Sequence, residues 1–192
     1  IADKSANPEF VAADLLSQAE HGADSQVILL TNDKRLAEQV VSALDKQLTH
    51  LSRKTIIEKA LEHARIMLLT DIKEAITWSN HYAPEHLILQ LTEPEVYLDS
   101  IQNAAAVFMG AWTPETMGDY LNGANHVLPT EGYAKTLSGL SVLDFMKYLS
   151  VQTVSKQGLK ALGRVAIDLA DAEQLTAHRR AVELRLKHLE LN

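Results

Sequence analysis

The segment MGDYLNGANHVLPT, residues 117–130, contains two side chains of types that can bind metals or transfer protons. Asp119 and His126 stand there among two glycines and a proline, and the segment has the periodicity of neither a core helix nor a core strand. Polar groups in such a segment indicate a site, and a carboxylate with an imidazole suits a divalent ion such as zinc. The alternative is a surface loop whose Asp and Asn stabilise turns.

A second pair, Gln18 and His21, ends a predicted helix. Residues three apart share a helix face, so the pair offers one amide oxygen and one imidazole nitrogen to a metal ion. The alternative is a histidine that interacts with the last carbonyl groups of its helix. Both interpretations stay open on this pair alone.

An acid and a base are adjacent at Glu85 and His86, directly before the apolar run 87–89 and after the stiffening Pro84. Such a pair beside a buried strand suits proton transfer. The alternative is an exposed carboxylate at the start of a strand, next to a partly packed histidine.

The last pair is Glu173 and His178. Five positions place two side chains roughly 140° apart on one ideal helix, so these two fit together best if Glu173 begins the helix. The alternative is a solvated helix end.

The elements that must position these residues follow from the apolar pattern. Short apolar runs predict strands at 26–30, 66–69, 87–89 and 106–109, with helices at about 8–21, 33–48, 54–64, from 71, and at 93–103. This alternation indicates an α/β fold with a mostly parallel, Rossmann-like sheet and flanking helices. Ligands of such sheets bind beyond the carboxyl ends of the strands, and residues 117–130 follow the last strand. The sheet lacks the usual Gly-x-Gly-x-x-Gly fingerprint.

The character of the chain changes after Gly139. Residues 1–139 form the predicted Rossmann-like domain, and residues 140–192 a mainly helical tail with a short helix at 141–148, a strand at 150–154 and helices from 155 onward. A tail of about 50 residues buries too little surface to be stable alone, so we expect it to pack on another domain or subunit.

Composition excludes several classes of function. The net charge of the 192 residues is −7, which argues against a nucleic-acid partner. No apolar run approaches the roughly 20 residues that a membrane-spanning helix needs, so no membrane partner is expected. The sequence has no cysteine, which removes disulfides, thiolate ligands and a cysteine nucleophile.

Taken in order, several strings of the chain closely resemble histidinol dehydrogenase. They are Ser17-Gln18-Ala19-Glu20-His21, Pro84-Glu85-His86, Gly118-Asp119-Tyr120, Asn125-His126-Val127-Leu128-Pro129-Thr130 and Ala177-His178. The resemblance covers essentially all 192 residues, and its first and fourth strings are specific.

This resemblance implies a cytoplasmic enzyme of histidine biosynthesis that oxidises L-histidinol to L-histidine through histidinaldehyde, with two NAD and a bound zinc ion. It implies that Gln18, His21, Asp119 and His178 ligate zinc, that Glu85 and His86 are the catalytic acid–base pair, and that His126 and Glu173 hold the substrate, which His86 and the zinc ligands also contact. It further implies a homodimer whose tails cross, so that His178 completes the partner's site.

The chain departs from the family in length. Family members are more than twice as long, and a segment with an Ala-Gly-Pro motif and a second nucleotide-type domain, which supplies most NAD contacts, have no counterpart here. The chain is therefore expected to be a C-terminal portion that is inactive alone. The alternatives are a non-catalytic zinc- or substrate-binding fragment, a module that works beside a separate N-terminal chain, and a purely structural α/β domain.

Overall fold

The computed structural model describes residues 1–191 and forms two compact units, Ile1–Phe145 and Met146–Asn192. The first unit contains α1 (Pro8–Ala19), β1 (Ile28–Thr31), α2 (Lys34–Leu48), α3 (Lys54–Leu61), β2 (Arg65–Leu68), α4 (Ile72–Tyr82), β3 (His86–Leu89), η1 (Pro94–Ser100), β4 (Ala106–Met109), α5 (Glu115–Tyr120), η2 (Tyr133–Lys135) and η3 (Val142–Phe145). The expected domain boundary after residue 139 stays a prediction.

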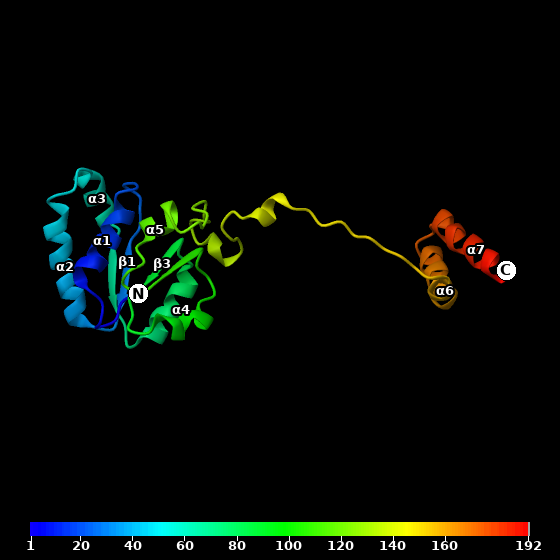
Figure 1. The fold of residues 1–192 in the computed structure, drawn as a ribbon, viewed down its shortest axis with the longest axis horizontal. Helices are drawn as coiled ribbons and strands as arrows, with labels where there is room; N and C mark the ends of the chain where they lie inside the picture. Colours follow the sequence, from blue (N-terminus) through cyan, green and yellow to red (C-terminus); the bar gives the residue numbers. More distant parts are fainter. Residues whose placement is uncertain (192) are drawn as a thin grey trace. The chain divides into compact units, whose positions relative to one another are not determined.

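The strands form two parallel pairs that meet at a single residue. β1 pairs with β2, β3 pairs with β4, and Ala2 bridges both pairs through Thr31 and Gln90. The strand order is therefore β2–β1–Ala2–β3–β4, and the chain start lies between β1 and β3 (Figure 1). The predicted α/β fold with a mostly parallel sheet is confirmed.

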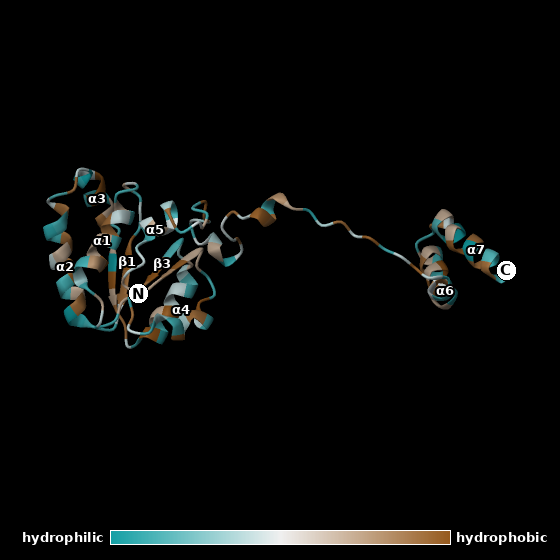
Figure 2. Ribbon diagram, viewed as in Figure 1, coloured by the Kyte–Doolittle hydropathy of each residue, from teal (hydrophilic) through white to brown (hydrophobic). Residues whose placement is uncertain are grey.

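Helices pack on both faces of the sheet around Ala2, β1 and β3. Ala2 and Leu29 pack with α1 and α2 on one face, whereas Ile1 joins Leu87 and Leu89 against α4 on the other. A third cluster packs α1 on α3. Burial on both faces explains why β1 and β3 read as continuous apolar runs, which are brown in Figure 2, whereas β2 is largely exposed.

The starts of three helices follow from their capping residues. Asn7, Asp33 and Asp71 each accept a hydrogen bond from a backbone N–H two or three residues later in α1, α2 and α4. These caps satisfy N–H groups that have no partner within the helix. The positions of these helix starts were therefore readable from sequence.

The segment 117–130 is not wholly irregular, because its first four residues end the short helix α5. Gly110 has a φ of 82° and turns the chain directly after β4, which allows α5 to fold back over the strands. Gly118 then lies so close to β4 that a Cβ atom on it would come within 2.5 Å of the Phe108 ring. A glycine is required at this approach.

The second unit is a pair of packed helices, α6 (Lys156–Ala172) and α7 (Thr176–Glu190), in which the side chain of Leu186 packs against Gly163. The strand predicted at 150–154 is wrong: these residues are exposed and form no regular element. Alternation alone cannot make a strand, because a strand also needs a neighbour to hydrogen-bond with. Many apolar side chains of this unit are exposed, among them Tyr148, Leu162 and Leu169.

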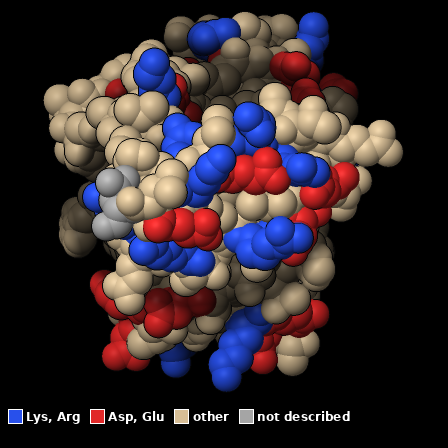
Figure 3. Space-filling model, turned by 90° about the vertical axis from the view of Figure 1, so that its right-hand side faces the viewer, with Lys and Arg blue, Asp and Glu red and all other residues tan. Residues whose placement is uncertain are grey.

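Among residues 1–191, no helix combines the length and apolarity needed to cross a bilayer. Acidic and basic side chains are interspersed on the face of the molecule drawn in Figure 3.

We predict that Gly118→Val destabilises the chain by about 1–3 kcal/mol, because its side chain would overlap the buried Phe108 ring. Urea denaturation measures this free energy of unfolding. Thr116→Val is the matched control, since it places the same side chain on an exposed position of α5 and should change stability by less than about 0.5 kcal/mol. Equal losses in the two variants would contradict the close approach.

Candidate functional site

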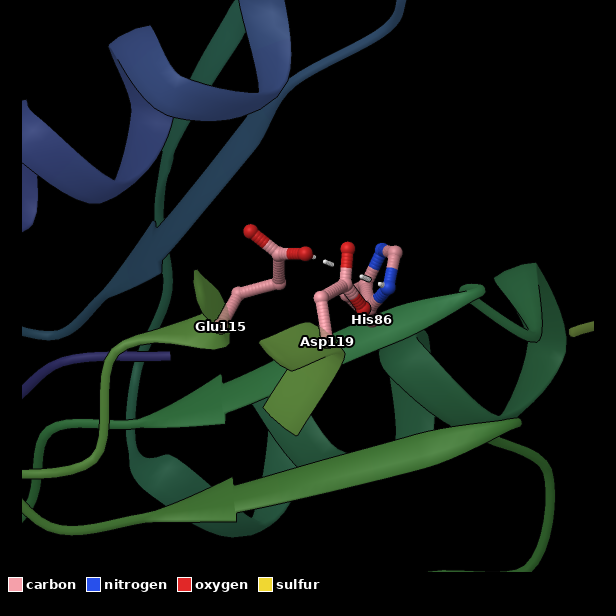
Figure 4. A group of neighbouring side chains, drawn as sticks. All are labelled: His86, Glu115 and Asp119. Carbon is pink, nitrogen blue, oxygen red and sulfur yellow. Dashed lines mark ion pairs between the residues drawn. The ribbon is translucent and has the colours of Figure 1, made fainter. Parts of the chain in front are cut away.

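Three side chains converge on one point above the sheet. His86 is the first residue of β3, while Glu115 and Asp119 lie one turn apart on α5 and so share a face. One ligand atom from each lies within 4.8 Å of the others, and the three groups point toward one another in Figure 4. A carboxylate pair with an imidazole has the chemistry of a divalent-metal site.

The cluster contains buried polar atoms that the protein itself does not satisfy. Glu115 is only 4% exposed, and its Oε1 lies 3.9 Å from His86 Nε2, which is too long for a hydrogen bond. Within the described part of the chain, both atoms lack a hydrogen-bond partner. Leaving such groups unpaired costs about 1–3 kcal/mol each, so the cluster is suited to a further polar or cationic group.

Burial and like charge shift the acid–base behaviour of the cluster. Burial raises the pKa of Glu115 from 4.5 to about 7, with the Asp119 carboxylate adding to the rise and the Gln18 side chain opposing it. Burial lowers the pKa of His86 from 6.5, and His21 adds to this effect, whereas the carboxylates of Glu85 and Asp119 oppose it. His86 is therefore predominantly a neutral imidazole near pH 7.

The end of α1 brings two more predicted residues to the same place. Gln18 is in the last turn of α1 and its buried Nε2 lacks a partner among the described residues, while His21 directly follows the C-cap, Glu20. Gln18 lines the same cavity as Glu85 and His86, and the charge of His21 acts on His86. The helix α1 ends at Ala19, two residues earlier than predicted. This difference does not move Gln18 and His21 away from the cluster.

The position of the cluster differs from the expected one. His86 opens β3, so the cluster lies at the amino end of that strand and not beyond the carboxyl ends of the sheet. The reason is the reversal at Gly110: α5 does not continue away from β4 but returns along it, which carries Asp119 back toward His86.

Glu115 was missed in the sequence. It directly follows Pro114, and its spacing of four from Asp119 would have placed both carboxylates on one face had residues 115–120 been predicted as a helix. Gly118 hid that helix, because glycine disfavours helical structure.

The remaining predicted residues stay outside this cluster or belong to the second unit. His126 is exposed in an irregular segment after α5. Glu173 is the C-cap of α6 and His178 lies in the first turn of α7, so the arrangement in which the two would fit together best, with Glu173 at the start of the helix of His178, does not occur. Gln174, with a φ of 58°, ends one helix before the next begins. The roles of His126, Glu173 and His178 stay predictions.

Two ligand sets for a divalent ion share Asp119. Residue resemblance assigns Gln18, His21, Asp119 and His178, whereas the atoms of His86, Glu115 and Asp119 lie closest together. The carboxylate oxygens and imidazole nitrogen of His86, Glu115 and Asp119, with unsatisfied buried atoms on His86 and Glu115, fit zinc.

Comparison with known proteins identifies similar sequences and a similar structure. The profile of the family described as histidinol dehydrogenase matches residues 1–186. Histidinol dehydrogenases from Pseudoalteromonas translucida and Yersinia pestis are 54% and 53% identical over 97% and 98% of this chain, which spans 43% of each relative's length. The crystal structure of histidinol dehydrogenase from Elizabethkingia anophelis matches with a TM-score of 0.93 and 51% identity, over 98% of this chain and 44% of that one.

We predict that Glu115→Gln stabilises the metal-free chain increasingly as the pH rises. The pKa of Glu115 is higher in the folded chain, about 7, than its ordinary value of 4.5, so the protonated form stabilises the fold at low pH and this contribution is lost between about pH 4.5 and 7. At pH 8 the variant should therefore be more stable by up to about 3 kcal/mol. Denaturation in chelator at pH 5 and pH 8 measures this.

The control for that experiment is Glu95→Gln, which removes an exposed carboxylate. Its effect on stability should be small and nearly independent of pH. An advantage of Glu115→Gln that does not grow from pH 5 to pH 8 would contradict a buried carboxyl with a raised pKa.

Proposed function

The chain belongs to the histidinol dehydrogenase family, and on that premise we propose that it carries the metal and acid–base part of an enzyme that oxidises L-histidinol to L-histidine through histidinaldehyde. The reaction is proposed to use zinc and two NAD. The observation that carries the proposal is the convergence of α1, β3 and α5, which brings Gln18, His86 and Asp119 together from distant parts of the chain.

We propose that zinc is held by Gln18, His21 and Asp119 together with His178. The first three lie at the cluster, and the unsatisfied buried atoms there support a bound cation. When bound, zinc would supply a template that anchors the imidazole and amine of the substrate. Glu115 would add negative charge beside Asp119.

Proton transfer is proposed for the residues at the start of β3. His86 accepts the proton of the substrate alcohol, and its lowered pKa supports this role because a base must be unprotonated at working pH. Glu85 activates the water that adds to the aldehyde. The sequence has no cysteine, so this part of the enzyme cannot form a thiohemiacetal in place of the hydrate.

We propose from the resemblance to the family that His126 and Glu173 bind the substrate. We propose on the same ground that the protein is a homodimer with exchanged tails. The exposed apolar side chains of the second unit support an association that covers them. In such a dimer His178 would serve the partner's site. The enzyme is proposed to be cytoplasmic.

The chain spans about 43% of its curated relatives, so most NAD contacts are expected from sequence it does not share with them. We expect no NADH from histidinol, NAD and zinc with this chain alone, and NADH once the N-terminal portion of the Yersinia pestis relative is added. Turnover by the chain alone would contradict the incomplete NAD site.

Separately, calorimetry should show zinc binding that Asp119→Asn weakens at least about tenfold. Unchanged zinc affinity would refute the metal site.

We predict that Glu85→Gln, in the preparation that turns over, slows the oxidation of histidinaldehyde more than that of histidinol. The amide cannot activate water, whereas His86 still accepts the alcohol proton. Each half-reaction is followed by NADH formation from its own substrate, with the exposed Glu93→Gln as control. Equal losses in both half-reactions would refute this division of roles.

A further inference from the structure

Phe108 lies directly beneath the candidate site. It is the third residue of β4 and is only 6% exposed. β3 and β4 pair in parallel with Ile88 opposite Phe108, so Phe108 and His86, two residues before Ile88, direct their side chains to the same face of the sheet. The ring of Phe108 is therefore a neighbour of the acid–base and metal cluster.

One side of the Phe108 ring contacts the proposed base. The ring centroids of Phe108 and His86 are 5.9 Å apart with an interplanar angle of 42°, which is within the usual range of aromatic pairs. His86 Nε2 has no hydrogen-bond partner among residues 1–191, so that atom does not orient the imidazole. The imidazole cannot turn toward β4 without displacing a buried ring, and packing therefore restrains it on this side.

The outer end of the same ring contacts the helix that carries the two carboxylates. A Cβ atom on Gly118 would lie 2.5 Å from Cε1 of Phe108 and 3.0 Å from Cζ, so the backbone of α5 rests on the ring edge. Gly118 directly precedes Asp119 and follows Glu115 by three residues. Phe108 thus touches α5 between the residues that supply the carboxylates, which lie above the strands in Figure 4.

The helix α5 is attached to β4 at its other end. The hydroxyl of Thr113 donates to the carbonyl of Met109 at 2.7 Å, which ties the start of the helix to the end of the strand. With its start fixed in this way, the helix can approach the sheet only as far as Phe108 allows. Asp119 lies beyond the contact with the ring, so its position should depend on Phe108 more than that of Glu115, which lies near the attachment.

The polar groups of the cluster do not fix their own spacing. Glu115 Oε1 and His86 Nε2 are 3.9 Å apart, and within the described part of the chain neither atom has a hydrogen-bond partner. Sites that bind a metal or transfer a proton need their groups held to within about 0.5 Å by side chains that packing locks in place. Phe108 is in contact with both sides of this cluster.

We propose that Phe108 is a positioning residue of the candidate site. Its ring separates the imidazole of His86 from the backbone of α5 at Gly118, and so sets the distance from His86 to the carboxylates of Glu115 and Asp119. This geometric role needs no ligand. Its consequence for zinc affinity rests on the proposed function, because Asp119 is proposed as a zinc ligand.

The test uses two substitutions that should compensate each other. Phe108→Leu removes Cε1 and Cζ, the ring atoms nearest to α5, whereas Gly118→Ala adds a methyl group at that same place. The Cδ1 atom of Phe108 would lie 3.7 Å from this methyl group, an ordinary contact distance, so a side chain that ends at Cδ leaves room for it. The experiment compares the full chain, both single variants and the double variant.

Crystal structures grown in chelator measure the geometry. We expect Asp119 to move toward the sheet by about 1 Å in Phe108→Leu and away from it by about 1 Å in Gly118→Ala, with a smaller shift of Glu115. In the double variant the distance from His86 to Asp119 should return to within about 0.5 Å of its original value. Stability alone would not discriminate, because alanine also favours the helix.

Calorimetry measures the consequence for metal binding. Zinc affinity should fall about fivefold or more in each single variant and return to within about twofold in the double variant. The control is Ile72→Val, which trims a buried side chain packed with Leu87 and Leu89 on the opposite face of the sheet. It should leave zinc affinity within about twofold of the original value.

Two results would overturn the proposal. One is a Phe108→Leu structure in which Asp119 and His86 keep their separation within about 0.5 Å. The other is a double variant whose displacement is no smaller than those of the single variants, since ring and helix would then not share one contact. A chain that binds no zinc, or binds it equally well after Asp119→Asn, would refute the proposed function instead, and the crystal structures would still decide the role of Phe108.

Discussion

The structure depends on the two hydrogen-bonded bridges that Ala2 makes to β1 and β3. Each strand pair is a half-sheet with its own helices, and a two-stranded unit is marginally stable by itself. Ala2 is 1% exposed and Asp3 adds hydrogen bonds to Thr92, so this short segment fixes the register between the halves. The junction therefore sets how Gln18 and His21 of the first half lie relative to His86, Glu115 and Asp119 of the second half.

The candidate site brings together side chains whose burial and mutual repulsion are unfavourable when no ligand is bound. Glu115 and Asp119 repel, His86 is partly dehydrated, and buried atoms of Glu115, His86 and Gln18 lack partners within the described residues. A folded chain tolerates such a cluster only if the surrounding packing stabilises it, here the contact of Gly118 with Phe108. Strain of this kind, held by a well-packed helix, is typical of functional sites.

The sequence was most informative where local chemistry determines structure. Apolar runs located the four strands, and Asn7, Asp33 and Asp71 located helix starts, because capping and burial act over a few residues. Gln18, Glu85, His86 and Asp119 stood out by residue type, and the structure brings them together.

What sequence could not predict were features that depend on distant contacts. Glu115 was missed because α5 is stabilised by its packing on Phe108, which no local pattern shows. The strand expected at 150–154 failed because pairing requires a neighbouring strand.

The junction at Ala2 also bears on the order of folding. The bridge between Ala2 and Gln90 joins residues that are far apart in the sequence, so closing it carries a larger loop-entropy cost than forming the local helices or the β1–β2 pair. Gln18 and His21 belong to the first half-sheet, whereas His86, Glu115 and Asp119 belong to the second. The binding site is thus completed only when the halves dock, and the kinetics of ion capture would report the last step of folding.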